Sequence, residues 1–281
     1  MDRQRLTITL SEDTLSKIDG FIDGTKIRNR SHAIEYLINQ TLTPKVSQAV
    51  ILAGGRGLHM RPFTFEMPKG LLPVGGRPIL EHIVELLREY EIRDILFSTG
   101  HLGDKIKDHF GDGKKLGVKI SYLQEEMPLG TGGALSLSQK KIVGDTFLVV
   151  HGDILIDINL SDLITFHKEQ GTVGTIALTS VADPSAFGEV ALNGSKITKF
   201  VEKPKKGDEV SQLINCGVYV FEKDIFDYIP RMGSSLLEDI FPKLAAEKQL
   251  SGFIFSGKWV DVGTPLSYEK AIKEWGEKDS K

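Results

Sequence analysis

The chain is poor in the features that define several protein classes. A single cysteine, Cys216, among 281 residues excludes an internal disulfide and predicts a reducing compartment, so we expect a cytoplasmic protein. No apolar run approaches the ~20 residues that span a bilayer, and the N-terminus is too polar for a signal peptide, so no membrane partner is expected. The net charge of −3 excludes affinity for nucleic acid over the whole surface.

One segment is unusually rich in glycine. Residues 49–53 form an apolar run typical of a buried strand, and Gly54, Gly55 and Gly57 follow it closely. Because glycine has no Cβ, backbone N–H groups in such a turn can approach an anion closely. Lys69 comes after a proline-containing loop that can fold back over the same anion. This pattern predicts a phosphate-binding site.

Two common phosphate motifs do not match this segment. A Walker loop would end in Gly-Lys-Ser/Thr, which is absent, and a dinucleotide fingerprint starting at Gly55 would need glycine where Met60 stands. Residues 52–69 instead resemble the signature of the sugar-1-phosphate nucleotidyltransferases, Leu-Ala-Gly-Gly-x-Gly-Thr-Arg-Leu-x-Pro-x-Thr-x-x-x-Pro-Lys. The register is kept without a gap, with Leu58 for Thr, His59 for Arg and Met60 for Leu.

The change at His59 matters most for the activity that the resemblance implies. In the family this arginine grips the triphosphate tail, whereas histidine is shorter and mostly neutral at pH 7. Losing such a contact would cost about 2–4 kcal/mol in the transition state. Arg56 or Arg61 can replace the contact, or the site binds its ligand without turnover.

Two aspartates follow apolar segments. Asp153 comes just after the run 147–151, at the end of a strand where open α/β sheets bind ligands, and Asp261 follows the pair Trp259-Val260. Alone, each is as consistent with a turn or a helix cap. In the family that the glycine loop resembles, these two carboxylates hold Mg²⁺, which prefers hard oxygen ligands together with substrate phosphates. The resemblance therefore implies a Mg²⁺ site at Asp153 and Asp261.

Further segments match the family pattern, which assigns them to sugar and nucleobase. The Glu-Lys-Pro element at 202–204 supplies a glutamate for sugar hydroxyls and a lysine for the sugar phosphate, and the loop 128–133 cups the base. The catalytic residues implied are Lys69, Asp153, Asp261 and His59. The implied nucleotide-binding residues are Leu52, Ala53, Gly54, Gly55, Gly57, Glu125, Gly130 and Thr131. Those implied for the sugar phosphate are Gly188, Glu202, Lys203 and Asn215.

The chemistry of Glu125 bears on the nucleobase. Guanine offers N1–H and N2–H₂ donors to an acceptor-only carboxylate, while uracil and thymine suit an amide better. We therefore favour GTP, although the neighbouring Gln124 and Glu126 can exchange roles with Glu125 through a small backbone shift. The sugar phosphate is already an anionic nucleophile, so the reaction with the α-phosphorus needs no general base. Positioning and charge neutralisation by Mg²⁺, Lys69 and Lys203 would suffice.

The N-terminal segment lies outside the transferase signature. Residues 5–10 alternate like a β-strand, and two short helical stretches follow, capped by Ser11 and by Asn29 or Ser31. About forty residues cannot bury a sufficient core, and a lone strand needs a partner. Two chains pairing their strands would solve both problems, and Arg-Leu-Thr-Ile-Thr-Leu-Ser-Glu resembles the ribbon–helix–helix repressors. The expected divisions are a homodimeric ribbon–helix–helix segment at 1–43, a linker at 44–48 and a nucleotidyltransferase domain at 49–281.

In the ribbon–helix–helix family the paired strands enter the DNA major groove. The resemblance implies that the outward residues read base edges and that the start of the second helix meets phosphate. The residues concerned are Arg5, Thr7 and Thr9 on the ribbon, and Asn29, Arg30 and Ser31 on the helix. Residues 1–45 carry seven Lys and Arg against six Asp and Glu, a weak balance for DNA binding. Operator DNA as a partner and dimerisation alone both remain open.

From residue 49 onward, apolar strands alternate with helical stretches, which predicts a sheet with helices on both faces. Together with the resemblance, this gives a Rossmann-like three-layer αβα domain with a mixed sheet. The strand-like ranges are 95–99, 118–123, 147–150, 175–180 and 217–221, and the helix-like ranges are 78–90, 104–110, 160–169 and 236–248.

Two functions from different classes fit these observations. The first is an active, Mg²⁺-dependent sugar-1-phosphate nucleotidyltransferase that takes an NTP and a sugar 1-phosphate. The second is a transcription regulator whose transferase-like domain only senses a nucleotide sugar or an NTP, and an enzyme that represses its own operon would combine the two. The set Lys69, Asp153, Glu202, Lys203 and Asp261 favours the enzyme, because a sensor need not keep both metal carboxylates.

Overall fold

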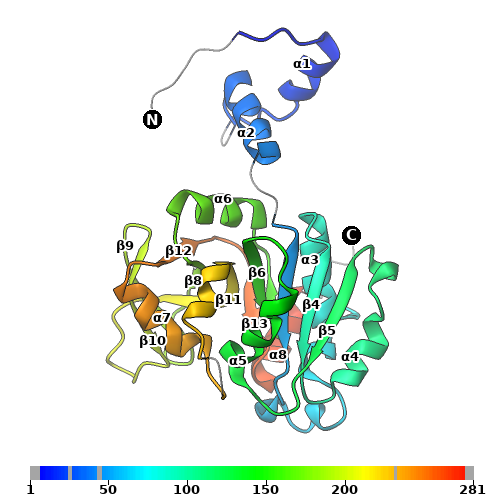
Figure 1. The fold of residues 1–281 in the computed structure, drawn as a ribbon, viewed down its shortest axis with the longest axis vertical. Helices are drawn as coiled ribbons and strands as arrows, with labels where there is room; N and C mark the ends of the chain where they lie inside the picture. The colour runs from blue at the N-terminus through cyan, green and yellow to red at the C-terminus, as the bar shows by residue number, and fades with distance from the viewer. Residues whose placement is uncertain (1–6, 25–26, 43–45, 231–232, 276–281) are drawn as a thin grey trace. The chain divides into compact units, whose positions relative to one another are not determined.

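The computed structural model describes residues 7–24, 27–42, 46–230 and 233–275. The chain divides into two compact units, Met1–Lys45 and Val46–Lys281 (Figure 1). Within the described ranges, no helix is both long and apolar enough to cross a membrane.

The first unit contains two helices, α1 (Glu12–Asp19) and α2 (Arg30–Leu42). The Ser11 side chain accepts a hydrogen bond from the Thr14 N–H at the start of α1, and Asn29 Oδ1 accepts one from the His32 N–H, 3.0 Å away, at the start of α2. Both helices therefore begin at side chains that the sequence offers as caps. The buried apolar residues of the described part of this unit are Ile18, Ile27 and Ala33.

The expected ribbon is only partly within the described residues. Arg5 lies outside them, and residues 7–10 have no regular secondary structure in this single chain. Arg30, expected at DNA phosphate, forms an exposed two-bond ion pair with Asp19, with nitrogen–oxygen distances of 2.6 and 2.7 Å. The paired ribbon and its contacts with DNA therefore stay predictions.

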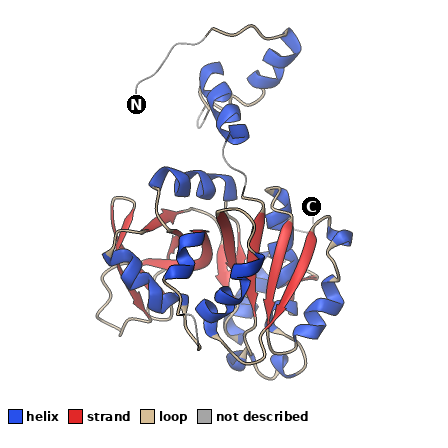
Figure 2. Cartoon of the chain, in the orientation of Figure 1, coloured by secondary structure: helices blue, strands red, loops and turns tan. Residues whose placement is uncertain are grey.

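The second unit is built on a nine-stranded sheet (Figure 2). Its spatial order is β5-β4-β1-β6-β11-β8-β12-β10-β9, and two small sheets pair β2 with β3 and β7 with β13. The strands β5, β4, β1 and β6 are mutually parallel, and β11 runs antiparallel to both β6 and β8, so the sheet is mixed as expected. The strand bounds are β1 Gln48–Ala53, β2 Pro73–Val74, β3 Arg77–Pro78, β4 Asp94–Thr99, β5 Lys119–Gln124, β6 Thr146–His151, β7 Ile154–Ile156, β8 Gly174–Ser180, β9 Gly188–Asn193, β10 Lys196–Glu202, β11 Leu213–Glu222, β12 Leu250–Ile254 and β13 Trp259–Asp261.

Helices cover both faces of this sheet because side chains alternate along each strand. Ala49 and Ile51 of β1 belong to one buried apolar cluster, and Val50 belongs to the other. The first cluster includes α3 (Ile79–Glu89), α4 (Gly103–Phe110), α6 (Leu160–Gln170) and α8 (Pro265–Trp275). The second includes α5 (Gly130–Ser138) and α7 (Leu237–Ala246). The three-layer α/β arrangement is thus confirmed for this unit.

Candidate active site

The expected site residues gather at one edge of the sheet. Three neighbouring parallel strands, β1, β4 and β6, end there at Ala53, Thr99 and His151. The glycine loop continues directly from β1, and Asp153 follows β6 by two residues. Open α/β sheets bind ligands beyond the carboxyl ends of their strands, so this edge is the candidate active site.

Two glycines in this region lie so close to neighbouring atoms that a Cβ would not fit. A Cβ at Gly54 would lie 2.1 Å from a carboxylate oxygen of Glu125, and one at Gly100 would lie 2.6 Å from the Gly54 carbonyl oxygen. At Gly57 the backbone has φ of +60°, and its carbonyl accepts a 2.7 Å hydrogen bond from the Thr64 hydroxyl. The loop therefore has a defined shape that side chains at these positions would change.

A pocket of about 240 Å³ opens beside this loop. Its lining residues are Gly54, Arg56, Gly100, His101, Gln124, Glu125, Glu126, Met127 and Pro128. Glu125 is buried, and it accepts hydrogen bonds from the Ser98 hydroxyl (3.3 Å) and the Leu129 N–H (3.2 Å). Burial raises the pKa of Glu125, and these two hydrogen bonds oppose the rise. The Gln124 amide is bonded to Gly100 and Thr99, so Glu125 is the better placed of the two to accept from a base.

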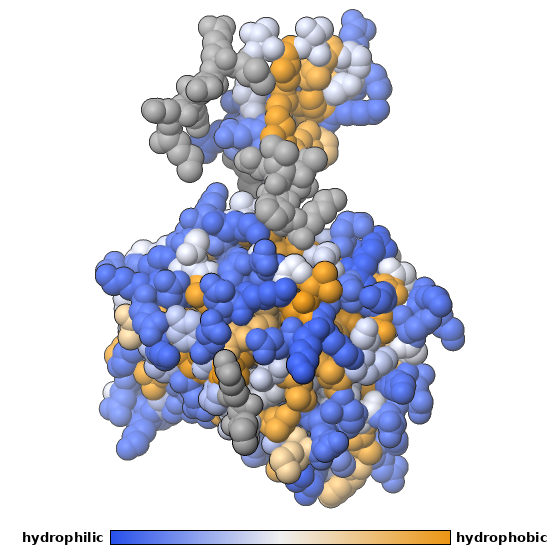
Figure 3. Space-filling model, viewed as in Figure 1, coloured by the Kyte–Doolittle hydropathy of each residue, from blue (hydrophilic) through white to orange (hydrophobic). Residues whose placement is uncertain are grey.

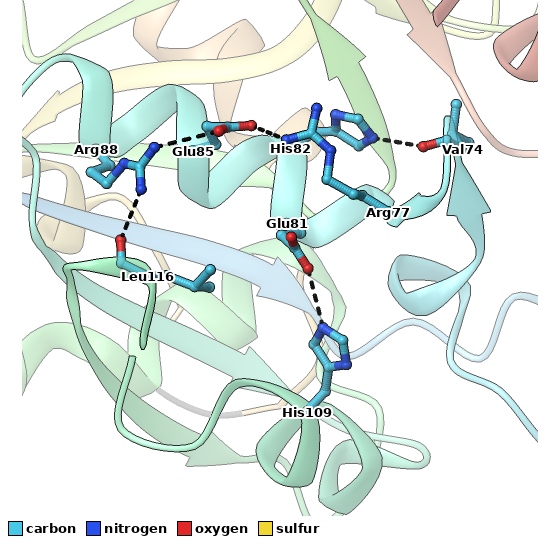
Figure 4. A network of polar contacts seen from close by, with 8 residues as sticks. All are labelled: Val74, Arg77, Glu81, His82, Glu85, Arg88, His109 and Leu116. Carbon is cyan, nitrogen blue, oxygen red and sulfur yellow. Dashed lines mark hydrogen bonds and ion pairs between the residues drawn. The ribbon is translucent and has the colours of Figure 1, made fainter. Parts of the chain in front are cut away.

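Lys69 lies at the centre of the charged part of the site. Its ammonium group pairs with the carboxylate of Asp153, and both side chains are mostly buried. The loop after Lys69 is tied to α3, since His82 bonds the Val74 carbonyl at 2.9 Å (Figure 4). In the same view, Arg77 and Arg88 both contact Glu85. The contacts of Val74 and Arg77 hold β2 and β3, which follow Lys69 in the chain, against α3.

A second small sheet brings Asp261 to Asp153. β13 pairs antiparallel with β7, so Asp261 lies opposite Ile154, and the Val262 N–H donates to the Asp153 carbonyl at 2.9 Å. Segments more than a hundred residues apart in sequence therefore place two carboxylates at one position. Sequence reasoning expected both aspartates, and the β7–β13 pairing explains how they meet.

The charges of this group perturb one another. Burial lowers the pKa of Lys69, but attraction to Asp153 and Asp261 outweighs burial and raises it above its usual value. Burial raises the pKa of Asp153, but Lys69, His151 and local hydrogen bonds outweigh it, so that pKa is lowered. Burial and repulsion from Asp153 raise the pKa of Asp261 to about 7. Two carboxylates thus compete for one lysine.

This donor set fits a divalent cation bound together with phosphates. Among the described residues, no three His, Cys, Asp or Glu side chains form a metal-binding group. Mg²⁺ needs no such cage, because it commonly binds one or two carboxylates and completes its shell with waters and substrate phosphates. Asp153 and Asp261 are hard oxygen donors whose mutual repulsion a cation would relieve.

The Glu-Lys-Pro element lies at the end of β10. Glu202 pairs in register with Gly188 of β9, and a Cβ at Gly188 would lie 2.9 Å from a Glu202 carboxylate oxygen. Lys203 has φ of +46°, unusual for a residue with a side chain, and its N–H donates to the Phe187 carbonyl. Burial and Asp153 raise the pKa of Asp261, and the positive charges of Lys69 and Lys203 oppose that rise.

Two expected ligand residues have partners within the protein. Asn215 accepts from the Gly217 N–H (2.9 Å) and donates to the Tyr219 hydroxyl (2.8 Å). The Thr131 hydroxyl accepts from the Leu237 N–H and donates to Glu238, both at 2.9 Å. The side chains of Asn215 and Thr131 therefore shape the site through their neighbours.

The two arginines near His59, Arg56 and Arg61, differ in their position relative to the pocket. His59 and Arg56 are exposed, and Arg56 lines the pocket beside Gly54. The Arg61 guanidinium lies over the Phe65 ring, 5.0 Å from its centre. Of the two arginines that could replace the family arginine, Arg56 is the one on the pocket.

His151 and Tyr219 were not expected from the sequence as site residues. The Tyr219 hydroxyl and His151 Nε2 lie 3.2 Å apart, and Tyr219 is fully buried. A Cβ at Gly217 would lie 2.9 Å from the His151 ring, so the glycine makes room for it. The sequence signal for His151 was its position two residues before Asp153, while nothing in the sequence marks Tyr219.

The family of the chain follows from its match to a protein-family model. The model of the nucleotidyl transferase family matches residues 48–278. The chain belongs to the nucleotidyl transferase family. This match covers the whole sheet and every element of the candidate site, and the N-terminal unit lies outside it.

The curated relatives that the chain matches include mannose-1-phosphate guanylyltransferases. A mannose-1-phosphate guanylyltransferase of Mycobacterium tuberculosis is 36% identical over 224 residues, which are 78% of this chain and 62% of that protein. The mannose-1-phosphate guanylyltransferase catalytic subunit beta of Xenopus tropicalis is 35% identical over 226 residues, 79% of this chain and 62% of its own length. The matched region thus spans less than two thirds of these relatives.

Solved structures share the fold. One described as a glucose-1-phosphate thymidylyltransferase from Bacillus anthracis has a TM-score of 0.76 and 29% identity, covering 83% of this chain and 96% of that one. HddC from Yersinia pseudotuberculosis, complexed with GMP-PN, has a TM-score of 0.69 and 26% identity, covering 82% and 99%. The mixed α/β fold is therefore that of the sugar nucleotidyltransferases.

Proposed function

We propose that this protein transfers a nucleotidyl group from an NTP to a sugar 1-phosphate, with Mg²⁺, giving an NDP-sugar and pyrophosphate. The observation that carries the proposal is the group formed by Lys69, Asp153 and Asp261 at the strand edge beside the glycine loop. The names of the relatives support mannose 1-phosphate and GTP as the first substrates to test.

The reaction would proceed by in-line displacement. A phosphate oxygen of the sugar 1-phosphate forms a bond to the α-phosphorus, and the bond from that phosphorus to the pyrophosphate oxygen breaks. Lys69 would neutralise charge that develops on the phosphates, and Lys203 would hold the sugar phosphate. Bound to Asp153 and Asp261, Mg²⁺ would supply Lewis-acid neutralisation of the same phosphates.

The glycine loop and Glu125 would bind the nucleotide. Backbone N–H groups of Gly54, Gly55 and Gly57 would donate to its phosphates, as in other glycine-rich anion sites. Glu125 is held at the pocket wall with carboxylate lone pairs beyond those used by Ser98 and Leu129. A carboxylate there supports a preference for guanine.

Pyrophosphate release tests the activity. Purified protein with Mg²⁺ would be assayed with four NTPs and a panel of hexose 1-phosphates. Turnover abolished by Asp153→Ala and retained by Asp108→Ala, an exposed aspartate on α4, would support the enzyme. A loss of GTP preference of about tenfold or more in Glu125→Gln would support the base assignment. No turnover with any pair, alongside tight nucleotide-sugar binding, would reject the enzyme in favour of a sensor.

The N-terminal unit supports a second role, a ribbon–helix–helix dimer that can bind operator DNA. The described part of this unit buries few apolar side chains, while Ile8, Phe21 and Ile38 are 45–49% exposed. Apolar side chains gather on the face of this unit seen in Figure 3. A second copy would cover these side chains and pair the strand expected at residues 5–10.

Light scattering of the full chain tests this arrangement. Phe21→Glu should dissociate the dimer, whereas Ile272→Glu, which changes a similarly exposed residue of α8, should not. A monomeric wild type would refute it. If DNA is bound, Thr7→Ala should alter sequence preference for the region upstream of the gene, while a variant that removes only a phosphate contact weakens all sequences alike.

A further inference from the structure

The loop expected to cup the nucleobase is joined to helix α7 by reciprocal capping. The Gly132 and Gly133 N–H groups at the start of α5 donate to the Ser235 carbonyl, at 2.9 and 3.2 Å. In return, the Leu237 N–H at the start of α7 donates to the Thr131 hydroxyl. Each helix start therefore supplies the acceptor for the other, and the two loops form one structural piece.

The Thr131 hydroxyl also holds an acidic side chain of α7. It donates a 2.9 Å hydrogen bond to Oε2 of Glu238, which is half-buried. A threonine that accepts from one group and donates to the next has a fixed hydroxyl rotor, so Glu238 is oriented as well as tethered. Oε1 of Glu238 has no hydrogen bond from a neighbouring side chain among the described contacts.

Helix packing brings Glu238 to the sugar end of the candidate site. Phe241 lies one turn after Glu238 on the same helix face, and its ring packs edge-on against Phe200 of β10 at 5.0 Å. Phe200 and Glu202 are two residues apart on one face of β10, and both flank Gly188. Helix α7 thus packs on β10, the strand that ends at Glu202. Burial and then the negative charge of Glu238 raise the pKa of Glu202, and Lys203 opposes the rise.

Two like-charged carboxylates held together are unfavourable unless donors lie between them. A hexose presents a row of hydroxyl groups, which are such donors and carry no charge of their own. We propose that Glu238, oriented by Thr131, accepts hydrogen bonds from hydroxyl groups of the sugar 1-phosphate and helps to set sugar specificity. Thr131 is then a positioning residue for the sugar, although it belongs to the loop expected at the base. This inference rests on the proposed function of the same site.

Steady-state kinetics of the full chain with GTP and mannose 1-phosphate test the proposal. Glu238→Gln and Thr131→Val should raise KM for the sugar phosphate by about 10–100-fold, the range for a hydrogen bond to a charged group. Thr131→Ser, which keeps the hydroxyl, should stay within about twofold of wild type. Glu247→Gln, which removes a carboxylate at the other end of α7, is the matched control. GTP affinity, titrated without sugar, should be unchanged in all four variants.

Two results would overturn the inference. One is a weaker GTP affinity in Thr131→Val with an unchanged KM for the sugar phosphate, because Thr131 would then serve the nucleobase. The other is unchanged kinetics in Glu238→Gln. If the wild type shows no turnover, the proposed function fails instead, and calorimetric titration with mannose 1-phosphate decides. Equal affinities of wild type and Glu238→Gln, or no binding to either, would then refute a sugar role for Glu238.

Discussion

Removing the charge of Lys69 should destabilise the second unit measurably. Lys69→Met leaves Asp153 and Asp261 without their cation, and breaking a buried pair costs about 3–5 kcal/mol. The Lys69 and Asp153 side chains are 17% and 27% exposed, so water screens part of their attraction and reduces this free-energy cost. We therefore expect about 2–3 kcal/mol. For a unit of this size, that corresponds to a fall in Tm of about 4–12 °C.

Thermal and urea unfolding in a double-mutant cycle would measure this effect. In Lys69→Met with Asp153→Asn, one of the two uncompensated carboxylates is gone and Asp261 no longer faces a second charge, so part of the lost stability should return as a coupling energy of about 1–2 kcal/mol. Lys115→Met, which removes the same charge at an exposed position, should change stability by less than about 0.5 kcal/mol. Effects of Lys69→Met and Asp153→Asn that add within about 0.5 kcal/mol would refute the pairing argument.

Three further outcomes are expected. Burial lowers the pKa of His167 below 6.5 and outweighs the opposing effect of its bond to Glu222. As the pH drops below about 6.5, the imidazole is therefore protonated in the unfolded chain before it is protonated in the folded one, and stability falls. The Tm of His167→Gln should fall less between pH 8 and pH 5 than that of wild type. Gly188→Ala puts a Cβ 2.5 Å from the Phe200 ring, so urea unfolding should show a loss of about 1–3 kcal/mol, and an unchanged midpoint would contradict the packing. Mg²⁺ should raise the Tm of wild type in the presence of GTP, and a similar rise in Asp153→Asn would argue against that ligand.

The sequence predicted the elements whose pattern is strong. The range 78–90 carries a regular apolar stripe, and α3 occupies Ile79–Glu89. The strands β9 and β10 were missed because polar and glycine residues interrupt their apolar pattern, and only part of each strand is buried. Helix α5 was missed since Gly130–Gly133 favours a loop; its start is stabilised by the Ser235 carbonyl, a contact about a hundred residues away.

In the candidate site too, motif residues could be predicted from the sequence, whereas contacts between distant segments could not. Asp153 and Asp261 could be named from motifs, and their meeting depends on the pairing of β7 with β13. The partners of Thr131 could not be inferred, because its hydroxyl bonds a helix that is distant in sequence. Motif residues thus predict which chemistry is present, and tertiary contacts determine which substrate group each side chain can reach.

The arrangement of charge argues for turnover over sensing. Lys69 is paired with Asp153, and Lys203 lies 3.6 Å from Glu202, so each lysine is partly neutralised before any phosphate arrives. A protein that only bound an anionic nucleotide sugar would gain affinity from unpaired lysines, and neighbouring carboxylates would reduce it. With a divalent cation held by Asp153 and Asp261, those carboxylates would no longer compete for Lys69, and both lysines would be free to neutralise phosphate charge during transfer. Asp153 and Asp261 beside Lys69 therefore weaken the binding of an anionic ligand, and this is expected of a nucleotidyl transfer site, where the two carboxylates would hold the cation.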